Sequence, residues 1–75
     1  MRYKEGERDG KGKEYDIYSN TMLFEGEYLN GKRNGIGKEY DCNNKLIYIG
    51  LYLSNKKWSG KAYDENDNIV YEIIN

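Results

Sequence analysis

The side chains of this 75-residue chain support little catalytic chemistry. The chain contains no histidine, so a Ser-His or Cys-His nucleophile pair is impossible. Cys42 is the single cysteine and has no sequence neighbour that would activate it, so we interpret it as a partly exposed thiol. Glu25 and Glu27 are spaced as solvated charges on the wet face of a strand. We therefore expect no catalytic residue and no enzymatic activity.

Metal and phosphate motifs are also incomplete. The stretch DENDN, Asp64 to Asn68, lacks the sixth-position glycine and the twelfth-position glutamate of a calcium loop, so its composition favours a turn. The stretch GERDGKGK lacks the Gly-Lys-Ser/Thr ending of a phosphate-binding loop. We expect no metal, no cofactor and no small-molecule substrate.

Twelve basic and thirteen acidic side chains leave a net charge of -1, which excludes a global field that would draw the chain onto nucleic acid. The basic residues nevertheless gather at the predicted hairpin turns, as Arg8, Lys32, Arg33, Lys56 and Lys57. Two interpretations stay open. The cluster contacts anionic phospholipid head groups, or it is a solvated edge that prevents strand-to-strand aggregation.

One strand differs from the others in its apolar content. In LIYIGLYL, Leu46 to Leu53, Ile49 and Leu51 occupy the positions that Glu25 and Glu27 have one unit earlier, so both faces of the strand are apolar. We predict a partner or self-association surface centred on Ile47, Ile49, Leu51 and Leu53, to which Trp58 adds. The alternative is that the C-terminal tail or a curled sheet covers these residues within the monomer.

The elements that must position these residues recur along the chain. Nine residues have identical counterparts 25 positions later: Tyr3, Gly6, Arg8, Gly10, Gly12, Lys13, Glu14, Tyr15 and Asp16. FEGEYL at residues 24–29 returns as YIGLYL at residues 48–53, and GKEYD at residues 37–41 returns as GKAYD at residues 60–64. Each unit is predicted to form a strand with period-two alternation, a tight turn and a return strand. In the unit at residues 24–47 the turn is Asn30-Gly31 and the return strand covers residues 35–41.

Glycines inside these strands leave bare backbone, and we predict that a tyrosine ring from a neighbouring strand lies across each bare site, with its hydroxyl reaching water. Because one hairpin is marginal alone, stacking of the units stabilises the array. We expect a single domain over residues 1–75, either whole or a piece of a longer protein. It comprises a partial unit without its opening strand at 1–23, full units at 24–47 and 48–70, and a partial unit at 71–75.

These residues resemble the MORN (membrane occupation and recognition nexus) repeat. Its hallmarks are an aromatic-x-Gly-x-aromatic strand, a Gly-Lys-Arg-x-Gly-x-Gly turn and a tyrosine on the return strand. FEGEYLNGKRNGIGKEYD, residues 24–41, is similar almost position by position. The unit at 48–70 departs from the pattern, since Asn55 replaces Gly31 and Trp58 replaces Gly35.

The resemblance implies an all-β fold: successive antiparallel hairpins forming an elongated single-layer sheet with an aromatic groove. It implies a non-catalytic scaffold or adaptor for protein–protein interaction or self-association, or alternatively a peripheral membrane adaptor that binds anionic phospholipids through the basic turn edge. Groove aromatics are Phe24, Tyr28, Tyr40, Tyr48, Tyr52 and Tyr63, of which Tyr28 and Tyr52 are assigned to partner contacts. Because the chain has little else to pack, we expect most of these rings to serve first as core. With no apolar signal core or membrane-length run, we expect a cytoplasmic chain.

Overall fold

The computed structural model describes residues 2–6 and 9–75, with side chains from residue 9 onward. Within these residues there are seven strands: β1 (Arg2–Gly6), β2 (Gly10–Asp16), β3 (Met22–Leu29), β4 (Lys32–Tyr40), β5 (Leu46–Leu53), β6 (Lys56–Tyr63) and β7 (Ile69–Ile73). None of the described segments forms a helix long and apolar enough to span a membrane.

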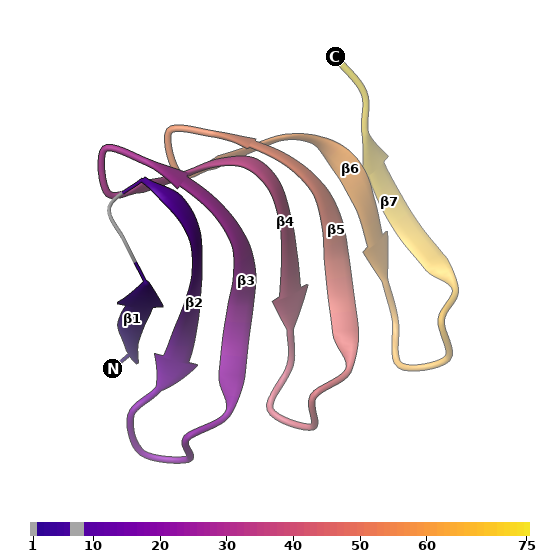
Figure 1. Cartoon of the computed structure of the whole chain (residues 1–75). Helices are drawn as coiled ribbons and strands as arrows, with labels where there is room; N and C mark the ends of the chain where they lie inside the picture. The colour runs from indigo at the N-terminus through magenta and orange to yellow at the C-terminus, as the bar shows by residue number, and fades with distance from the viewer. Residues whose placement is uncertain (1, 7–8) are drawn as a thin grey trace.

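The strands form one open antiparallel sheet in the order β1-β2-β3-β4-β5-β6-β7, and they curve together (Figure 1). The predicted all-β fold of successive hairpins in a single layer is therefore confirmed. The molecule measures 32 × 31 × 16 Å, so with seven described strands its two long dimensions are nearly the same. Strands β1 and β7 lie at opposite edges of the sheet (Figure 1).

The turn between β3 and β4 has the backbone conformation that Asn-Gly predicts. Asn30 and Gly31 both have positive φ, at 53° and 79°, as a type I′ hairpin turn requires. Ser54 and Asn55 adopt the same region in the next hairpin, at 50° and 74°. Asparagine tolerates this conformation, so the loss of glycine at position 55 does not change the turn.

Loops of one kind join consecutive units. Asp41 Oδ1 accepts backbone hydrogen bonds from Asn43 and Lys45 at 2.8 and 2.9 Å, and Asp64 Oδ1 accepts from Asn66 and Asn68 at the same distances. The Asn68 and Asn66 bonds hold the pKa of Asp64 below its usual value. The DENDN segment is thus the predicted turn, and over residues 9–75 no group of three His, Cys, Asp or Glu side chains could hold a metal.

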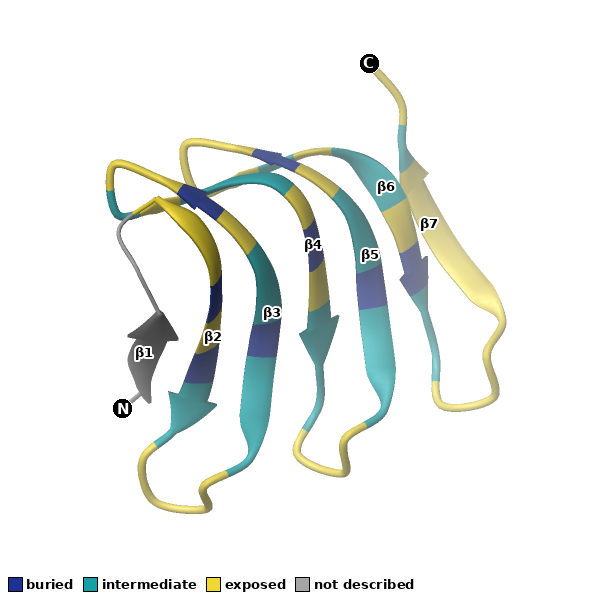
Figure 2. Ribbon diagram, in the orientation of Figure 1, coloured by how far each residue is buried: buried dark blue, intermediate teal, exposed yellow. Residues whose placement is uncertain are grey.

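The core is one layer of rings on a single face of the sheet. Its buried members are Phe24, Tyr28, Tyr48, Tyr52 and Ala62, against which Ile73 packs. These residues form dark bands across the strands in Figure 2. Neighbouring rings meet edge to face, with centroids 5.7 Å apart for Phe24–Tyr28 and 5.1 Å apart for Phe24–Tyr52.

Glycines make room for these rings, as predicted, although the ring nearest to Gly37 is that of Phe24 rather than a tyrosine. A Cβ atom on Gly37 would lie 2.5 Å from two atoms of the Phe24 ring and 2.9 Å from Cε1 of Tyr52. A Cβ atom on Gly60 would lie 2.5 Å from the hydroxyl of Tyr48. All three distances are shorter than van der Waals contact, so these rings lie directly on glycine backbone.

Each full unit contains a β-bulge in the same place. In the β3–β4 pair, Gly26 faces Gly37 and Tyr28 faces Arg33, so Glu27 alone is opposite the three residues 34–36. In the β5–β6 pair, Gly50 faces Gly60 and Tyr52 faces Lys57, so Leu51 is opposite only residues 58–59. The bulge therefore absorbs the one-residue difference between the units.

The first unit differs from its predicted form. The sequence comparison matches Gly6 with Gly31 and leaves the unit without an opening strand, whereas the structure pairs β1 with β2. Gly6 faces Gly12 in this pair, the relation that Gly26 has to Gly37. The register of this hairpin thus repeats the glycine pair of the later units, not the 25-residue offset of the sequence.

Candidate functional site

Arg33 lies on the aromatic face, although the sequence suggested a turn cation. β4 begins at Lys32, so Arg33 is already in the strand and faces Tyr28. Its guanidinium carbon is 4.1 Å from the Phe24 ring centroid, and its Nε and Nη2 donate to Glu14 at 2.7 and 2.9 Å. Nη1 lies 3.4 Å from Glu39. The arginine thus bridges carboxylates of two consecutive units above an aromatic ring.

Two buried phenols complete this network. Tyr28 donates its hydroxyl hydrogen to Glu14 at 2.7 Å, and Tyr52 donates to Glu39 in the same way one unit later. Burial, and then the neighbouring carboxylate, raise the pKa of each phenol well above the ordinary tyrosine value. Tyr28 and Tyr52 are only 5% and 3% exposed, so the partner-contact role expected for them does not fit: both are core residues.

The network changes in the third hairpin. Lys57 takes the place of Arg33, with its ammonium 4.5 Å from the Tyr48 ring centroid, 3.8 Å from Glu39 and 3.2 Å from the Tyr71 hydroxyl. Ala62 takes the place of Glu14 and Glu39 and is buried. The series of shared carboxylates therefore stops at Glu39 in the described part of the chain.

The predicted basic edge is smaller than the sequence suggested. Arg33 and Lys57 are engaged with carboxylates and rings on the aromatic face, because both strands begin directly after their two-residue turns. Lys32 and Lys56 are exposed, and over residues 9–75 neither takes part in an ion pair. Arg8 lies outside the described residues. Of the four predicted members that the structure describes, Lys32 and Lys56 remain for contact with an anionic surface.

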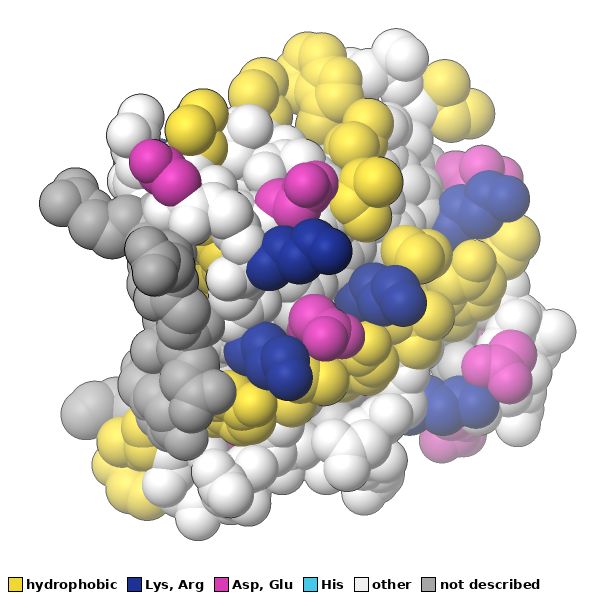
Figure 3. Space-filling view, in the orientation of Figure 1, with side chains coloured by type: hydrophobic (Ala, Val, Ile, Leu, Met, Phe, Trp, Pro, Cys, Tyr) yellow, Lys and Arg dark blue, Asp and Glu magenta, His cyan; other side chains and the backbone are white. Residues whose placement is uncertain are grey.

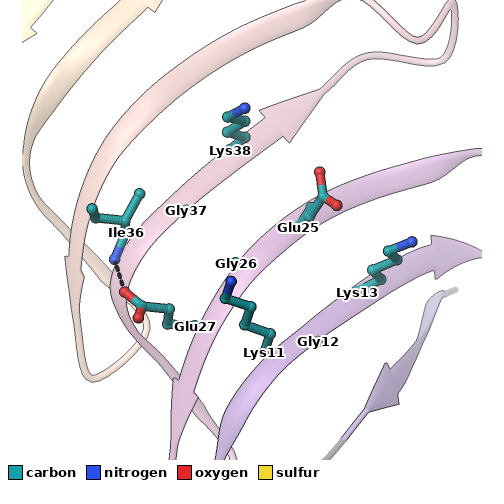
Figure 4. A pocket seen from close by; sticks show the side chains of 9 residues that line it. All are labelled: Lys11, Gly12, Lys13, Glu25, Gly26, Glu27, Ile36, Gly37 and Lys38. Carbon is teal, nitrogen blue, oxygen red and sulfur yellow. Dashed lines mark hydrogen bonds between the residues drawn. The ribbon is translucent and has the colours of Figure 1, made fainter.

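The opposite face carries a row of side chains that the register places side by side. From β2 to β7 the row reads Lys13, Glu25, Lys38, Ile49, Lys61 and Glu72. Its first three members help to line an open groove of about 700 Å³, which Lys11, Glu27 and Ile36 also line (Figure 4). One carboxylate oxygen of Glu27 is already hydrogen-bonded within the protein, since Oε1 accepts the Ile36 N–H at 2.7 Å. Bases and acids are mixed, so the groove has no strong preference for one charge.

The apolar part of this face lies on β4 and β5. Ile36 and Leu51 are directly opposite in the register and are 59% and 42% exposed. Ile49 is half-buried and Leu53 is exposed further along the same face of β5. We call Ile36, Ile49, Leu51 and Leu53 the apolar stripe. Figure 3 shows hydrophobic side chains running in bands beside lysines and acids.

The other residues predicted for this surface lie at its sides. Ile47 is half-buried, and Trp58 is exposed at the bulge of β6. The C-terminal strand β7 pairs with the edge of β6 instead of folding over the face. Ile36 and Leu51 therefore stay open to solvent, and the alternative that the tail covers the stripe does not hold for them.

Sequence reasoning missed the carboxylates of the network and the contribution of Ile36. Glu14 and Glu39 are 25 residues apart and Tyr28 and Tyr52 are 24 apart, so their joint recurrence was a usable signal of pairing. Ile36 has no counterpart of its kind in the other units. It could be found only from the register that places it beside Leu51.

Comparison with known families agrees with this geometry. The family model described as MORN repeat matches residues 2–16 and 24–45. No curated protein matches the chain. The hairpin β5–β6 lies beyond the matched residues, yet Gly50 faces Gly60 just as Gly26 faces Gly37. The family is consistent with a non-catalytic repeat module. The chain belongs to the MORN repeat family.

Proposed function

We propose that the chain is a protein-binding module and that the apolar stripe is its binding surface. The observation that carries the proposal is the exposed pair Ile36–Leu51, which stands where a unit of ordinary pattern has a charged, well-solvated face. Exposed apolar side chains grouped across two strands gain free energy when a partner removes them from water. The family context supports binding rather than catalysis.

The surroundings of the stripe indicate the chemistry of the partner. Ile49 lies between Lys38 on β4 and Lys61 on β6, and both lysines are exposed. Neither lysine takes part in an ion pair over residues 9–75. A partner with apolar side chains flanked by carboxylates would match this arrangement in both hydrophobicity and charge.

The test compares the wild-type chain with Ile36→Lys/Leu51→Lys. Proteins captured by the wild-type chain from an extract of its own cells are identified, and the purified candidate is titrated by calorimetry. We expect the double variant to lose at least about tenfold in affinity, which corresponds to about 1.4 kcal/mol. Lys11→Ala, on the charged part of the same face, is the matched control and should bind as wild type.

Two outcomes contradict the proposal. One is equal affinity of the wild-type chain and the double variant, with both shown to be folded by far-UV dichroism. The other is binding to vesicles containing anionic phospholipid that Lys32→Ser/Lys56→Ser abolishes and Ile36→Lys/Leu51→Lys leaves unchanged. The second result would assign the function to the turn edge.

A further inference from the structure

The hairpin β3–β4 contains two Asn-Gly pairs, Asn30-Gly31 and Asn34-Gly35. Asparagine is among the chemically labile residues of proteins. In an Asn-Gly pair the backbone nitrogen of glycine can attack the side-chain amide carbon of asparagine, because glycine has no side chain that hinders the approach. The structure surrounds the two pairs differently, and the difference favours reaction at Asn34.

The carboxylate of Glu27 lies against the backbone of Gly35. A Cβ atom on Gly35 would meet Glu27 Oε1 and would lie 3.1 Å from Glu27 Cδ. The bulge causes this contact, since Glu27 alone is opposite residues 34–36, and Oε1 accepts the Ile36 N–H at 2.7 Å (Figure 4). Oε2 makes no bond within residues 9–75. The carboxylate therefore has an oxygen with which to take the proton of the Gly35 nitrogen.

The side-chain oxygen of Asn34 is held by the next hairpin, because Oδ1 accepts the Ser54 N–H at 3.2 Å. When the Gly35 nitrogen adds to Cγ of Asn34, negative charge develops on this oxygen, and a donor already in place stabilises it. The other pair has neither feature. A Cβ atom on Gly31 would have no described atom within 4 Å, and Asn30 Oδ1 accepts no bond in the described part of the chain.

We propose that Asn34 is a self-modification site, at which the folded chain converts its own asparagine into aspartate and isoaspartate. The Gly35 nitrogen forms a bond to Cγ of Asn34 while Glu27 takes the proton from that nitrogen. The bond from Cγ to Nδ2 then breaks, and Nδ2 leaves as ammonia with the proton that Glu27 returns. Water opens the resulting succinimide at either carbonyl, which gives aspartate or isoaspartate. The reaction consumes one water, releases one ammonia and changes no oxidation state.

The fold already holds a carboxylate at the equivalent position of the preceding unit. Asp9 precedes Gly10 as Asn34 precedes Gly35, and both glycines have positive φ, at 93° and 105°. Asp9 Oδ1 accepts the Asn30 N–H at 2.7 Å, so an aspartate at position 34 can keep the bond between hairpins. Isoaspartate instead lengthens the backbone at the bulge. The reaction does not depend on what the apolar stripe binds.

The test is incubation of the purified full chain at neutral pH, followed by tryptic mapping. Trypsin cleaves after Lys32 and Arg33, so Asn30 and Asn34 fall in different peptides. Mass spectrometry follows the replacement of an amide by a carboxyl group in each peptide. We expect Asn34 to react at least about tenfold faster than Asn30 in the folded chain. In urea, where the surroundings of both pairs are lost, the two rates should become similar.

A substitution at Glu27 tests the proton transfer. Glu27→Gln keeps an oxygen for the Ile36 N–H but removes the base, so the rate at Asn34 should fall toward that at Asn30. Glu25→Gln, two residues away on the same face, is the matched control and should react as wild type. Equal rates at the two asparagines in the folded chain, a preference for Asn34 that persists in urea, or an unchanged rate in folded Glu27→Gln would each overturn the proposal. The comparison within the wild-type chain needs no substitution, so it decides the matter even if Glu27→Gln does not fold.

Discussion

The hydroxyl of Tyr28 donates a hydrogen bond to the carboxylate of Glu14 on the neighbouring strand, over 2.7 Å. The same carboxylate accepts two bonds from Arg33, so a phenol of one unit and an arginine of its return strand meet on an acid of the unit before. The backbone ladders β2–β3 and β4–β5 already join consecutive units, but glycines and rings alone would add no directional side-chain bond between them. The buried Glu14 supplies such bonds to Tyr28 and Arg33, and it thereby fixes the position of one hairpin relative to the preceding one.

Removing the Tyr28 hydroxyl should weaken this junction. Tyr28→Phe keeps the ring but deprives a buried carboxylate of one of its donors, and we expect a loss of about 1.5 kcal/mol in the free energy of unfolding. Urea denaturation monitored by dichroism measures it. An unchanged midpoint would show that the hydroxyl bond contributes nothing net.

Tyr48→Phe should behave in the opposite way. The Tyr48 hydroxyl is buried and has no hydrogen-bond partner among residues 9–75, and Phe24 already fills the equivalent position without a hydroxyl. Deleting an unsatisfied buried group should leave stability unchanged or raise it by about 1 kcal/mol. The same denaturation experiment serves, with Tyr28→Phe as its counterpart. A loss as large as that of Tyr28→Phe would contradict the difference between the two sites.

Gly37→Ala tests the contact between ring and backbone. The added methyl would lie 2.5 Å from the Phe24 ring and 2.9 Å from Tyr52, so the rings must shift. Overpacking of this kind costs about 1–3 kcal/mol, which for a chain of this size lowers the melting temperature by at least about 4 °C. Lys38→Ala, one residue later and exposed, is the control and should melt close to wild type.

Alkaline pH should unfold the protein through its buried phenols. The pKa values of Tyr28 and Tyr52 are raised in the folded state, so the stability that they contribute is complete below the unfolded value of about 10. It is lost as pH rises toward the folded values. Absorbance at 295 nm should show a late ionisation step that coincides with unfolding by dichroism. Tyr28→Phe/Tyr52→Phe should reduce this step to the part that the other phenols with raised pKa values, Tyr40 and Tyr48, contribute.

Asn34→Ala should loosen one turn rather than the whole sheet. Its side-chain oxygen accepts the Ser54 N–H at 3.2 Å in an exposed position, so we expect a loss of about 0.5–1 kcal/mol. Hydrogen exchange should become faster at Ser54 while the amides of β3 keep their protection. Faster exchange throughout β3 and β4 would mean that the contact stabilises the sheet globally.

Much of the fold could be predicted because its information is local and repeated. The glycines at 26, 37, 50 and 60 and the rings at 24 and 48 return at nearly constant spacing, and Asn30-Gly31 specifies a turn without outside help. The apolar stripe was partly predictable for the same reason. Ile49 and Leu51 stand out when their unit is laid over the preceding one.

The position of Arg33 was not predictable from its neighbours alone. The return strand was expected from Gly35 but begins at Lys32, and this difference moves Arg33 from a solvated turn into a strand beside Phe24. For Lys57, the bulge in β6 determines on which face of the sheet the side chain lies. The number of residues in that bulge depends on how β6 pairs with β5. Such features depend on register between strands, which alternation within one strand does not determine.

The bulge opposite Glu27 and Leu51 has a consequence for how such arrays change length. A residue gained or lost there leaves both flanking pairs, glycine with glycine and tyrosine with cation, where they were. An insertion between Phe24 and Gly26 would instead move the Phe24 ring away from the glycine backbone that it covers. It would also move every later side chain of β3 to the opposite face of the sheet. Natural length variation, and the deliberate tuning of curvature in artificial ribbons, should therefore concentrate at this one point of the repeat.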